Sequence, residues 1–287
     1  MTNSSDERVA KPEPSRLRVA SRARRLPSAD ASPESLPTSA TAEETPVGPE
    51  VAVIPVAQST VGGPQPVGYS VSSIATGSNG EIAGKITLNG TPPPETPVKT
   101  DPFCSERNLA LTTHNFLVGE SNGLANVVVS VKQETNTAAF SAPRTSVNAS
   151  IKNCELQPYV SVVIAGQTMF FQDKDGRAHH LALGETNVTV SVARNYFSIL
   201  PFPNPSPFVR LICRDHPWEK GFISVLANPF FAVTDKNGNF DIPNIPPGTY
   251  TIEIAHPAAT GTNGVTRSVI VVTGKKAELN VALDVPK

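Results

Sequence analysis

The sequence predicts an all-β protein, and three observations lead to this fold class. The 287 residues include 28 prolines and 19 glycines, which interrupt the chain too often for long helices. Between these turn residues lie short runs rich in valine, isoleucine and threonine, typical of strands. Only part of this length has the composition of a globular domain. We therefore expect two modest cores built from β-sandwiches of Greek-key type, preceded by a long extended tail.

Residues 1–80 form the predicted tail, which is rich in proline, serine and alanine. The segment has almost no aromatic residues and no sustained period of 2 or 3.6, so it cannot bury enough apolar surface to fold alone. Its first part is basic ("RLRVASRARR") and its second part is acidic and proline-rich. It is either a solvated linker or a segment that binds a protein partner and anchors the chain in a larger complex.

The strand signals begin at Glu81. There "EIAGKITLNG" alternates apolar and polar residues and runs into a glycine turn. Later runs of the same character are "GLANVVVSVK", "YVSVVIAG", "TMFFQD", "NVTVSVA", "FVRLIC" and "GFISVL". Turn residues separate them, which indicates a sandwich.

Two turns are predicted in the last part of the chain. "DKNG" (residues 235–238) predicts a hairpin turn between two apolar strands. "PPG" (residues 246–248) predicts a second turn, in which proline sets φ and Gly248 takes a positive φ.

A candidate metal loop lies between the last two of those strand runs. "CRDHPWE" places Cys213 and His216 on either side of a tight turn, so that a thiolate and an imidazole can converge on one point. Pro217 restrains the turn, and Trp218 can shield it from water. Three cysteines cannot all pair within one chain, which favours Cys213 as the free one. The alternative is a buried thiol beside a surface histidine.

A second imidazole is expected from an earlier strand end. "TMFFQDKDGRAHHLAL" contains an apolar strand, a polar turn and then His179 and His180. Adjacent residues of a strand point to opposite faces, so only one of the two can face the loop. His114 and His256 have no cluster of polar residues around them and are expected at the surface.

Several function classes find no support in the sequence. No nucleophile elbow, phosphate-binding loop or paired cysteine motif is present, so we expect a protein that is not an enzyme. The 24 basic and 25 acidic side chains nearly cancel, which argues against nucleic acid as a partner. No apolar run reaches 18 residues, so no transmembrane helix is expected, and the first 30 residues show no secretory signal.

Two segments resemble the carboxypeptidase-regulatory or transthyretin-like β-sandwich family. "GEIAGKI" (residues 80–86) is similar to its opening strand, and "TDKNGNFDIPNIPPGTY" (residues 234–250) is similar to a later strand pair. The resemblance implies that the first strand belongs with the C-terminal strands. Residues 81–118 and 226–287 would then form this sandwich, and residues 119–225 would be an inserted domain.

The inserted region resembles the plastocyanin and amicyanin type of cupredoxin. In that family a histidine follows an early strand, and a C-x-x-H-P-[FW]-M loop supplies a cysteine, a second histidine and an axial methionine. The alignment puts His179 on the first ligand, Cys213 on the thiolate and His216 on the second imidazole, while Glu219 falls on the methionine. Residues 81–285 also look like periplasmic proteins that combine a cupredoxin with a regulatory domain, some of them methylamine-utilisation-like.

Copper is the ion that this resemblance implies. The carboxylate of Glu219 is harder than a thioether, so it favours Cu(II) over Cu(I). It also makes zinc an alternative, because zinc accepts Cys, two His and Glu as a closed tetrahedral set. A third interpretation is that the loop is vestigial and binds no metal.

The resemblance also implies a disulfide between Cys104 and Cys154, since relatives have cysteines at both places. A disulfide fits a periplasmic or otherwise extracytoplasmic location. The function implied is one-electron transfer, with a redox partner, or copper holding. The alternative is a structural or accessory subunit of a larger complex, anchored through the tail.

Overall fold

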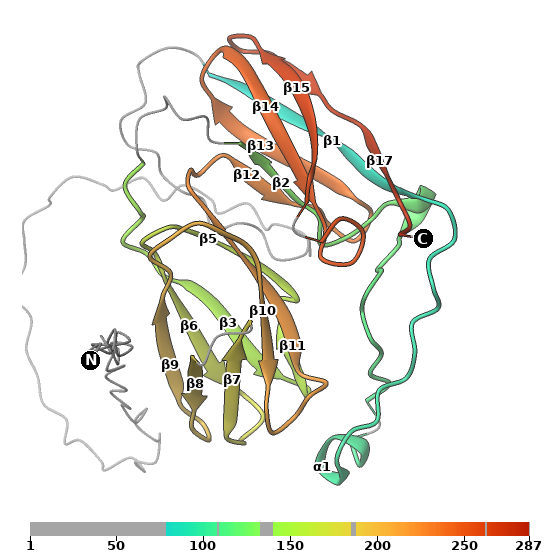
Figure 1. Cartoon of the computed structure of the whole chain (residues 1–287), viewed down its shortest axis with the longest axis vertical. Coiled ribbons are helices and arrows are strands. Elements are labelled where there is room, and N and C mark those ends of the chain that lie inside the picture. Colours follow the sequence, from blue (N-terminus) through green and yellow to red (C-terminus); the bar gives the residue numbers. More distant parts are fainter. Residues whose placement is uncertain (1–78, 108, 133–139, 185–187, 262, 287) are drawn as a thin grey trace, which may run out of the picture.

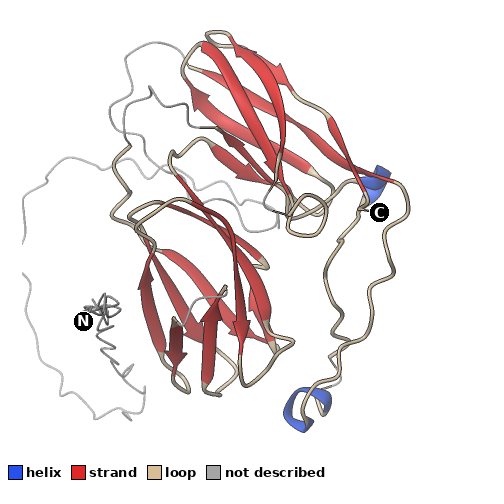
Figure 2. Cartoon of the chain, in the orientation of Figure 1, coloured by secondary structure: helices blue, strands red, loops and turns tan. Residues whose placement is uncertain are grey.

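The computed structural model describes residues 79–107, 109–132, 140–184, 188–261 and 263–286. Within these ranges almost every element is a strand, and the exceptions are the short helix α1 (Pro102–Ser105) and the 3-10 turn η1 (Glu120–Asn122) (Figures 1 and 2). The all-β class is therefore confirmed. None of these helices is of a length and character to cross a bilayer. The predicted tail lies outside the described residues, apart from its last two.

The first sandwich consists of two sheets from the two ends of the described chain. One sheet contains β1 (Gly80–Asn89), β13 (Asn239–Ile245), β16 (Lys276–Glu278) and β17 (Val281–Asp284). The other contains β2 (Val128–Val131), β12 (Phe231–Val233), β14 (Gly248–Ala255) and β15 (Val265–Val271). β1 pairs antiparallel with β13 and parallel with β16 and β17, so the first strand does lie among the C-terminal strands.

The core of this sandwich follows from the alternation of apolar residues. Ile82 and Ile86 of β1 and Ile242 of β13 point inward and are almost fully buried. Ile252 and Ile254 of β14 face them from the opposite sheet. Lys85 of β1 and Asp241 of β13 alternate with these isoleucines and are less buried, as expected for sheets with one face on the core.

The second sandwich lies between β2 and β12 in sequence (Figure 1). One sheet contains β5 (Val160–Ile164), β7 (His179–Leu183), β8 (Thr189–Val192), β10 (Ser206–Cys213) and β11 (Lys220–Leu226). The other contains β3 (Val147–Lys152), β4 (Glu155–Gln157), β6 (Thr168–Asp173) and β9 (Phe197–Pro201). Its core includes Phe171, Leu181 and Leu211, each 0% exposed.

Strand β2 links the two sandwiches in sequence. It lies inside the range 119–225, but it pairs with β12 and β14 of the first sandwich. That range therefore includes one strand of the flanking sandwich. A small apolar cluster joins the two bodies, with Val128 and Phe231 on one side and Val160, Val162 and Ile164 on the other. The predicted domain limits stay a prediction.

The two predicted turns are present, but both differ from the prediction. Residues 235–238 form a closed turn with Gly238 at φ +79°, yet β12 and β13 on either side belong to different sheets, so it is not a hairpin. Residues 246–248 likewise connect two sheets. Gly248 is not among the glycines with positive φ; instead Tyr250 closes this turn through its hydroxyl, which donates to the Pro246 carbonyl at 2.9 Å. Both turns therefore lead the chain from one sheet of the sandwich to the other, instead of reversing it within one sheet.

A long excursion leaves the first sandwich after β1 and returns at η1. We call its residues 90–118 the arm; it includes α1 and runs down beside the second sandwich (Figure 1). Its two limbs are held together by backbone hydrogen bonds, from Val98 N–H to the Leu111 carbonyl at 3.0 Å and from Thr113 N–H to the Thr96 carbonyl at 3.1 Å. The tip of the arm reaches the end of the second sandwich where β10 and β11 are connected.

Candidate metal centre

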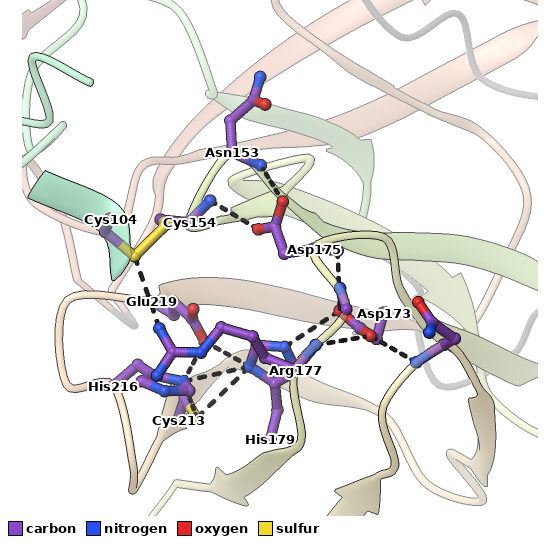
Figure 3. Close-up of polar contacts among 12 residues, drawn as sticks. Cys104, Asn153, Cys154, Asp173, Asp175, Arg177, His179, Cys213, His216 and Glu219 are labelled. Atoms are coloured by element: carbon purple, nitrogen blue, oxygen red, sulfur yellow. Dashed lines mark hydrogen bonds and ion pairs between the residues drawn. A yellow bond between two sulfur atoms is a disulfide. The ribbon is translucent and has the colours of Figure 1, made fainter. Parts of the chain in front are cut away.

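The loop between β10 and β11 holds three of the predicted metal ligands. Cys213 is the last residue of β10, and the inward-outward alternation of that strand buries its side chain completely. The loop is closed by two backbone hydrogen bonds, from Cys213 N–H to the Glu219 carbonyl at 2.9 Å and from Glu219 N–H to the His216 carbonyl at 2.8 Å. These bonds turn the side chains of Cys213, His216 and Glu219 toward one point (Figure 3).

The fourth residue comes from the neighbouring strand. β7 pairs with β10 so that Leu181 lies opposite Cys213, which brings the start of β7 to the metal loop. His179, the first residue of β7, points inward and is 0% exposed. His180 points outward, and its Nδ1 lies 2.6 Å from Asp215 Oδ2 at the surface. The two faces of the strand thus separate the histidines as the sequence predicted.

The four side chains meet in one compact cluster (Figure 3). His179 Nδ1 lies 3.2 Å from His216 Nδ1, 2.8 Å from Glu219 Oε2 and 3.9 Å from Cys213 Sγ. His216 Nδ1 lies 3.5 Å from Cys213 Sγ and 3.2 Å from Glu219 Oε2. Two nitrogen ligands of one tetrahedral ion, each about 2.0–2.1 Å from it, lie roughly 3.3 Å apart, and a nitrogen and a sulfur lie roughly 3.6 Å apart. The donor separations therefore fit a shared ion.

The burial and the charge of the four residues also favour a shared ion. All four residues are buried, and Glu219 Oε1 has no hydrogen-bond partner within the described ranges. A buried carboxylate beside a buried thiol is costly unless a cation compensates. No lysine or arginine in the described part of the chain forms an ion pair with Glu219, whose only partners of that kind are His179 and His216. A divalent ion bound between the four residues would supply the positive charge that compensates the Glu219 carboxylate.

In the metal-free chain a proton partly takes that place. Burial by itself lowers the pKa of His179, but Cys213 and the Glu219 carboxylate raise it more, to about 10. A protonated His179 cannot donate its Nδ1 lone pair to an ion. Metal binding must therefore displace a proton from the cluster.

Asp173 supports His179 from behind, and sequence reasoning did not identify it. Asp173 ends β6, is 3% exposed, and its Oδ1 lies 3.3 Å from His179 Nε2. Its carboxylate also accepts backbone N–H groups of Asp175, Gly176, Arg177 and Asn195, so it is held in place by the turn that follows. With Nε2–H facing Asp173, Nδ1 of His179 is left as the ligand atom. The only sequence signal was its position just before a polar turn.

The arm is attached to the second sandwich near the centre through Arg177, and this contact was also not predicted. Asp101 caps α1 by accepting from Cys104 N–H at 3.1 Å, and its other oxygen lies 2.5 Å from Arg177 Nη2. The Arg177 guanidinium lowers the pKa of Asp101. Arg177 Nη1 in addition reaches Cys104 Sγ at 3.7 Å (Figure 3). His216, which packs against Trp218 with 5.5 Å between ring centroids, is only 4% exposed.

The structure joins Cys104 and Cys154 in a disulfide, the pair implied by the family resemblance, and leaves Cys213 as a free, buried thiol. The disulfide ties α1 to the turn between β3 and β4. Asp175 fastens the same turn by accepting from Asn153 N–H at 2.9 Å and Cys154 N–H at 2.7 Å. The tip of the arm is thus attached covalently to the sandwich that contains Cys213, His179, His216 and Glu219.

The remaining histidines lie away from the centre. In the arm, His114 Nδ1 lies 3.3 Å from Glu155 Oε1. His256 was expected at the surface, and this expectation was wrong, because it is 1% exposed and stacks on Phe116. Its Nδ1 accepts from the backbone N–H groups of Ala258 and Ala259, which hold the ring in the turn that follows β14.

Comparisons with known proteins give partial likenesses to cupredoxins. No protein-family model and no curated protein matches the chain. Part of the chain is similar to a copper-containing nitrite reductase from Thermus scotoductus, with 19% identity and a TM-score of 0.27 over 34% of this chain and 26% of that chain. The chain thus spans about a quarter of that enzyme's length.

Two small cupredoxins match over nearly their whole length. A purple cupredoxin from Nitrosopumilus maritimus has 15% identity and a TM-score of 0.25 over 28% of this chain and 98% of its own. Amicyanin from Paracoccus versutus has 16% identity and a TM-score of 0.26 over 34% of this chain and 96% of its own.

Proposed function

We propose that this protein binds a single copper ion through Cys213, His179, His216 and Glu219, and that it transfers one electron or holds copper without catalysing a reaction. One observation carries the proposal: the four ligand atoms lie within 4.8 Å of one another, all on buried residues. Copper at such a site cycles between Cu(II) and Cu(I), which moves one electron.

The chemistry of the donors supports copper. A thiolate with two imidazoles is the donor set of mononuclear copper sites, and the loop from Cys213 to Glu219 is closed by its own backbone hydrogen bonds. Such closure holds the donors at nearly the same separation in both oxidation states. The Glu219 carboxylate favours the more highly charged oxidised ion, so we expect a lower reduction potential than with a thioether in its place.

The surroundings support the role and the place of action. Asp173 holds His179 at Nε2, and Trp218 packs against His216, which is 4% exposed. The disulfide between Cys104 and Cys154 supports a location outside the cytoplasm, where such bonds persist. We also propose that the first sandwich is transthyretin-like, which its strand connections and the two quoted motifs favour.

Copper titration of matched histidine variants tests the metal site. The full chain loaded with Cu(II) should bind one equivalent and show an intense thiolate-to-copper absorption band. His179→Gln should lose the band, whereas His180→Gln should keep it, because His180 is its exposed neighbour and lies outside the cluster. Cys213→Ser should also lose the band, with circular dichroism as the test of folding.

The outcomes separate the alternatives. One equivalent of tightly bound zinc in the native protein, with no band after copper addition, would favour the zinc site. A folded protein that binds neither ion would end the proposal and leave the vestigial loop. A band that survives in His179→Gln would contradict the ligand assignment.

A second candidate function is a structural or accessory subunit of a larger complex. The first sandwich supports it, since within its described residues no cluster of metal-binding side chains is present. It is thus a folded domain without an evident chemical site. Deleting residues 1–78 should release the protein from its complex while both sandwiches stay folded; retention in the complex would count against a tail anchor.

A further inference from the structure

A cavity of about 620 Å³ lies between the arm and the sheet that contains the metal loop. The arm contributes residues 98–101 and Thr113, and the sheet side contributes Arg210, Lys220 and the Pro217–Trp218 pair. Pockets for small organic ligands have volumes of about 300–1,000 Å³. None of the four proposed metal ligands lines this cavity.

The sheet side presents two cations on one face. In the antiparallel pair of β10 and β11, Arg210 lies opposite Phe222 and Ile212 lies opposite Lys220. Arg210 and Lys220 are therefore diagonal neighbours on the same face, close enough for long side chains to reach one point. Leu211 on the other face is buried in the core. The arm adds Lys99 as a third cation.

These three cations form no ion pair within the described ranges, and the acid in the cavity wall is already paired. Within the described ranges, neither Lys99 nor Arg210 forms an ion pair, and Lys220 Nζ donates only to Asn115 Oδ1 at 3.3 Å. Asp101, the acid in the cavity wall, is paired with Arg177 at 2.5 Å. Glu95 on the arm accepts from the Thr113 hydroxyl and the Phe116 N–H, but these donors are neutral, so Glu95 keeps its charge. Burial lowers the pKa of Lys220, and Glu95 acts to raise it. Lys99, Arg210 and Lys220 together outnumber this carboxylate, so the cavity has an excess of positive charge.

The remaining wall is apolar and ends at the metal loop. Val98, Pro217 and Trp218 form it, and the Trp218 ring packs against His216. Trp218 Nε1 is buried and has no hydrogen-bond partner within the described residues. An indole N–H is a donor only, so what it lacks is an acceptor. The cavity thus combines an apolar wall with guanidinium and ammonium groups.

We propose that this cavity binds a small organic carboxylate with a compact apolar body. The guanidinium of Arg210 can hold a carboxylate through two parallel hydrogen bonds, with Lys220 and Lys99 as further cations, while the apolar body lies against Trp218 and Val98. The site is separate from the metal ligands, so it stands whether or not the chain binds copper.

Calorimetric titration of the full chain with cyclohexanecarboxylate tests the proposal. Trp218 is the only tryptophan of the chain and lines the cavity, so its fluorescence should change with the same saturation curve. Cyclohexanecarboxamide has the same body without the charge and should bind at least about tenfold more weakly, since hydrogen bonds to charged groups are the stronger ones. Ionic strength is held constant throughout.

Two variants test which cations of the cavity bind the carboxylate. Arg210→Gln should lower the affinity for cyclohexanecarboxylate about tenfold or more, and Lys99→Gln should lower that affinity less. Both side chains are exposed, so neither change should affect folding. Arg194→Gln is the matched control, because Arg194 is exposed and lies outside the cavity; its affinity should equal that of the wild type.

Each contrary result overturns the proposal. Equal affinity for the carboxamide would show an apolar site without anion recognition. Unchanged affinity in Arg210→Gln, or no saturable signal with the carboxylate, would show that the cavity does not recognise carboxylates in this way. The copper band measured on the same samples reports separately on the metal site.

Discussion

The two sandwiches differ in how their buried polar side chains find partners. In the first, the Thr234 hydroxyl donates to the Leu124 carbonyl at 2.7 Å and accepts from Val127 N–H at 2.9 Å. In the second, His179, His216 and Glu219 face one another, and Glu219 Oε1 has no partner within the described ranges. Polar groups paired with backbone stabilise a fold, whereas donors that converge and remain incompletely paired mark a candidate site for a ligand.

Copper removal should affect only the second sandwich and should have the largest effect. A ligand that binds the folded state alone stabilises it by about 4 kcal/mol when its free concentration is 1,000 times its dissociation constant. We expect the free energy of unfolding, measured by urea titration with Trp218 fluorescence, to be higher by this amount in copper-loaded protein than in chelated protein. The His179→Gln variant should show no shift. An equal shift in that variant would mean that copper acts elsewhere.

Acid should destabilise the first sandwich, where His256 is the exception among the satisfied polar groups. Burial lowers the pKa of His256 from 6.5 to about 4, and its Nε2 has no hydrogen-bond partner within the described residues. The unfolded chain therefore takes up a proton below pH 6.5 that the folded chain takes up only near pH 4. Stability is lost as the pH falls through this window, by about 3 kcal/mol in total.

Urea unfolding of wild type and His256→Gln at pH 7.0 and about pH 4 measures this effect. Carboxylates also titrate in this range, but they are common to both proteins. The wild type should therefore lose about 3 kcal/mol more than the variant between the two pH values. Identical losses would show that His256 is not a source of acid sensitivity.

Asp173→Asn should have the smallest effect and should concern metal affinity. Groups that orient a ligating histidine typically change metal affinity by about 10–100-fold, or roughly 1.4–2.7 kcal/mol. Asp175→Asn is the matched control, since Asp175 bonds the neighbouring turn but does not touch His179. Copper competition titrations compare the two. Equal losses would assign the effect to the turn and not to the contact with His179.

Local pattern was enough to select the four residues that the structure brings together in one buried cluster. The spacing of Cys213 and His216 across a restrained turn is a property of four consecutive residues, and strand alternation separates His179 from His180. The resemblance to cupredoxins then selected Glu219. The structure brings these residues together because β7 and β10 are paired neighbours.

Contacts between distant segments were not predicted. Asp173 has no motif, and its role depends on where β6 ends relative to β7. The same holds for the arm, whose residue Asp101 meets Arg177 of the loop between β6 and β7. His256 was misjudged because its burial depends on Phe116, which is far from it in sequence.

The sequence by itself determined the all-β class and the residues that can bind a metal, because alternation, turn chemistry and ligand spacing act over a few residues. The tertiary structure decided which donors are left incompletely paired, where the arm is attached to the second sandwich, and how Arg210 and Lys99 come to share one cavity. These features depend on pairing between strands and loops far apart in the chain, and burial there sets the energy of every polar group.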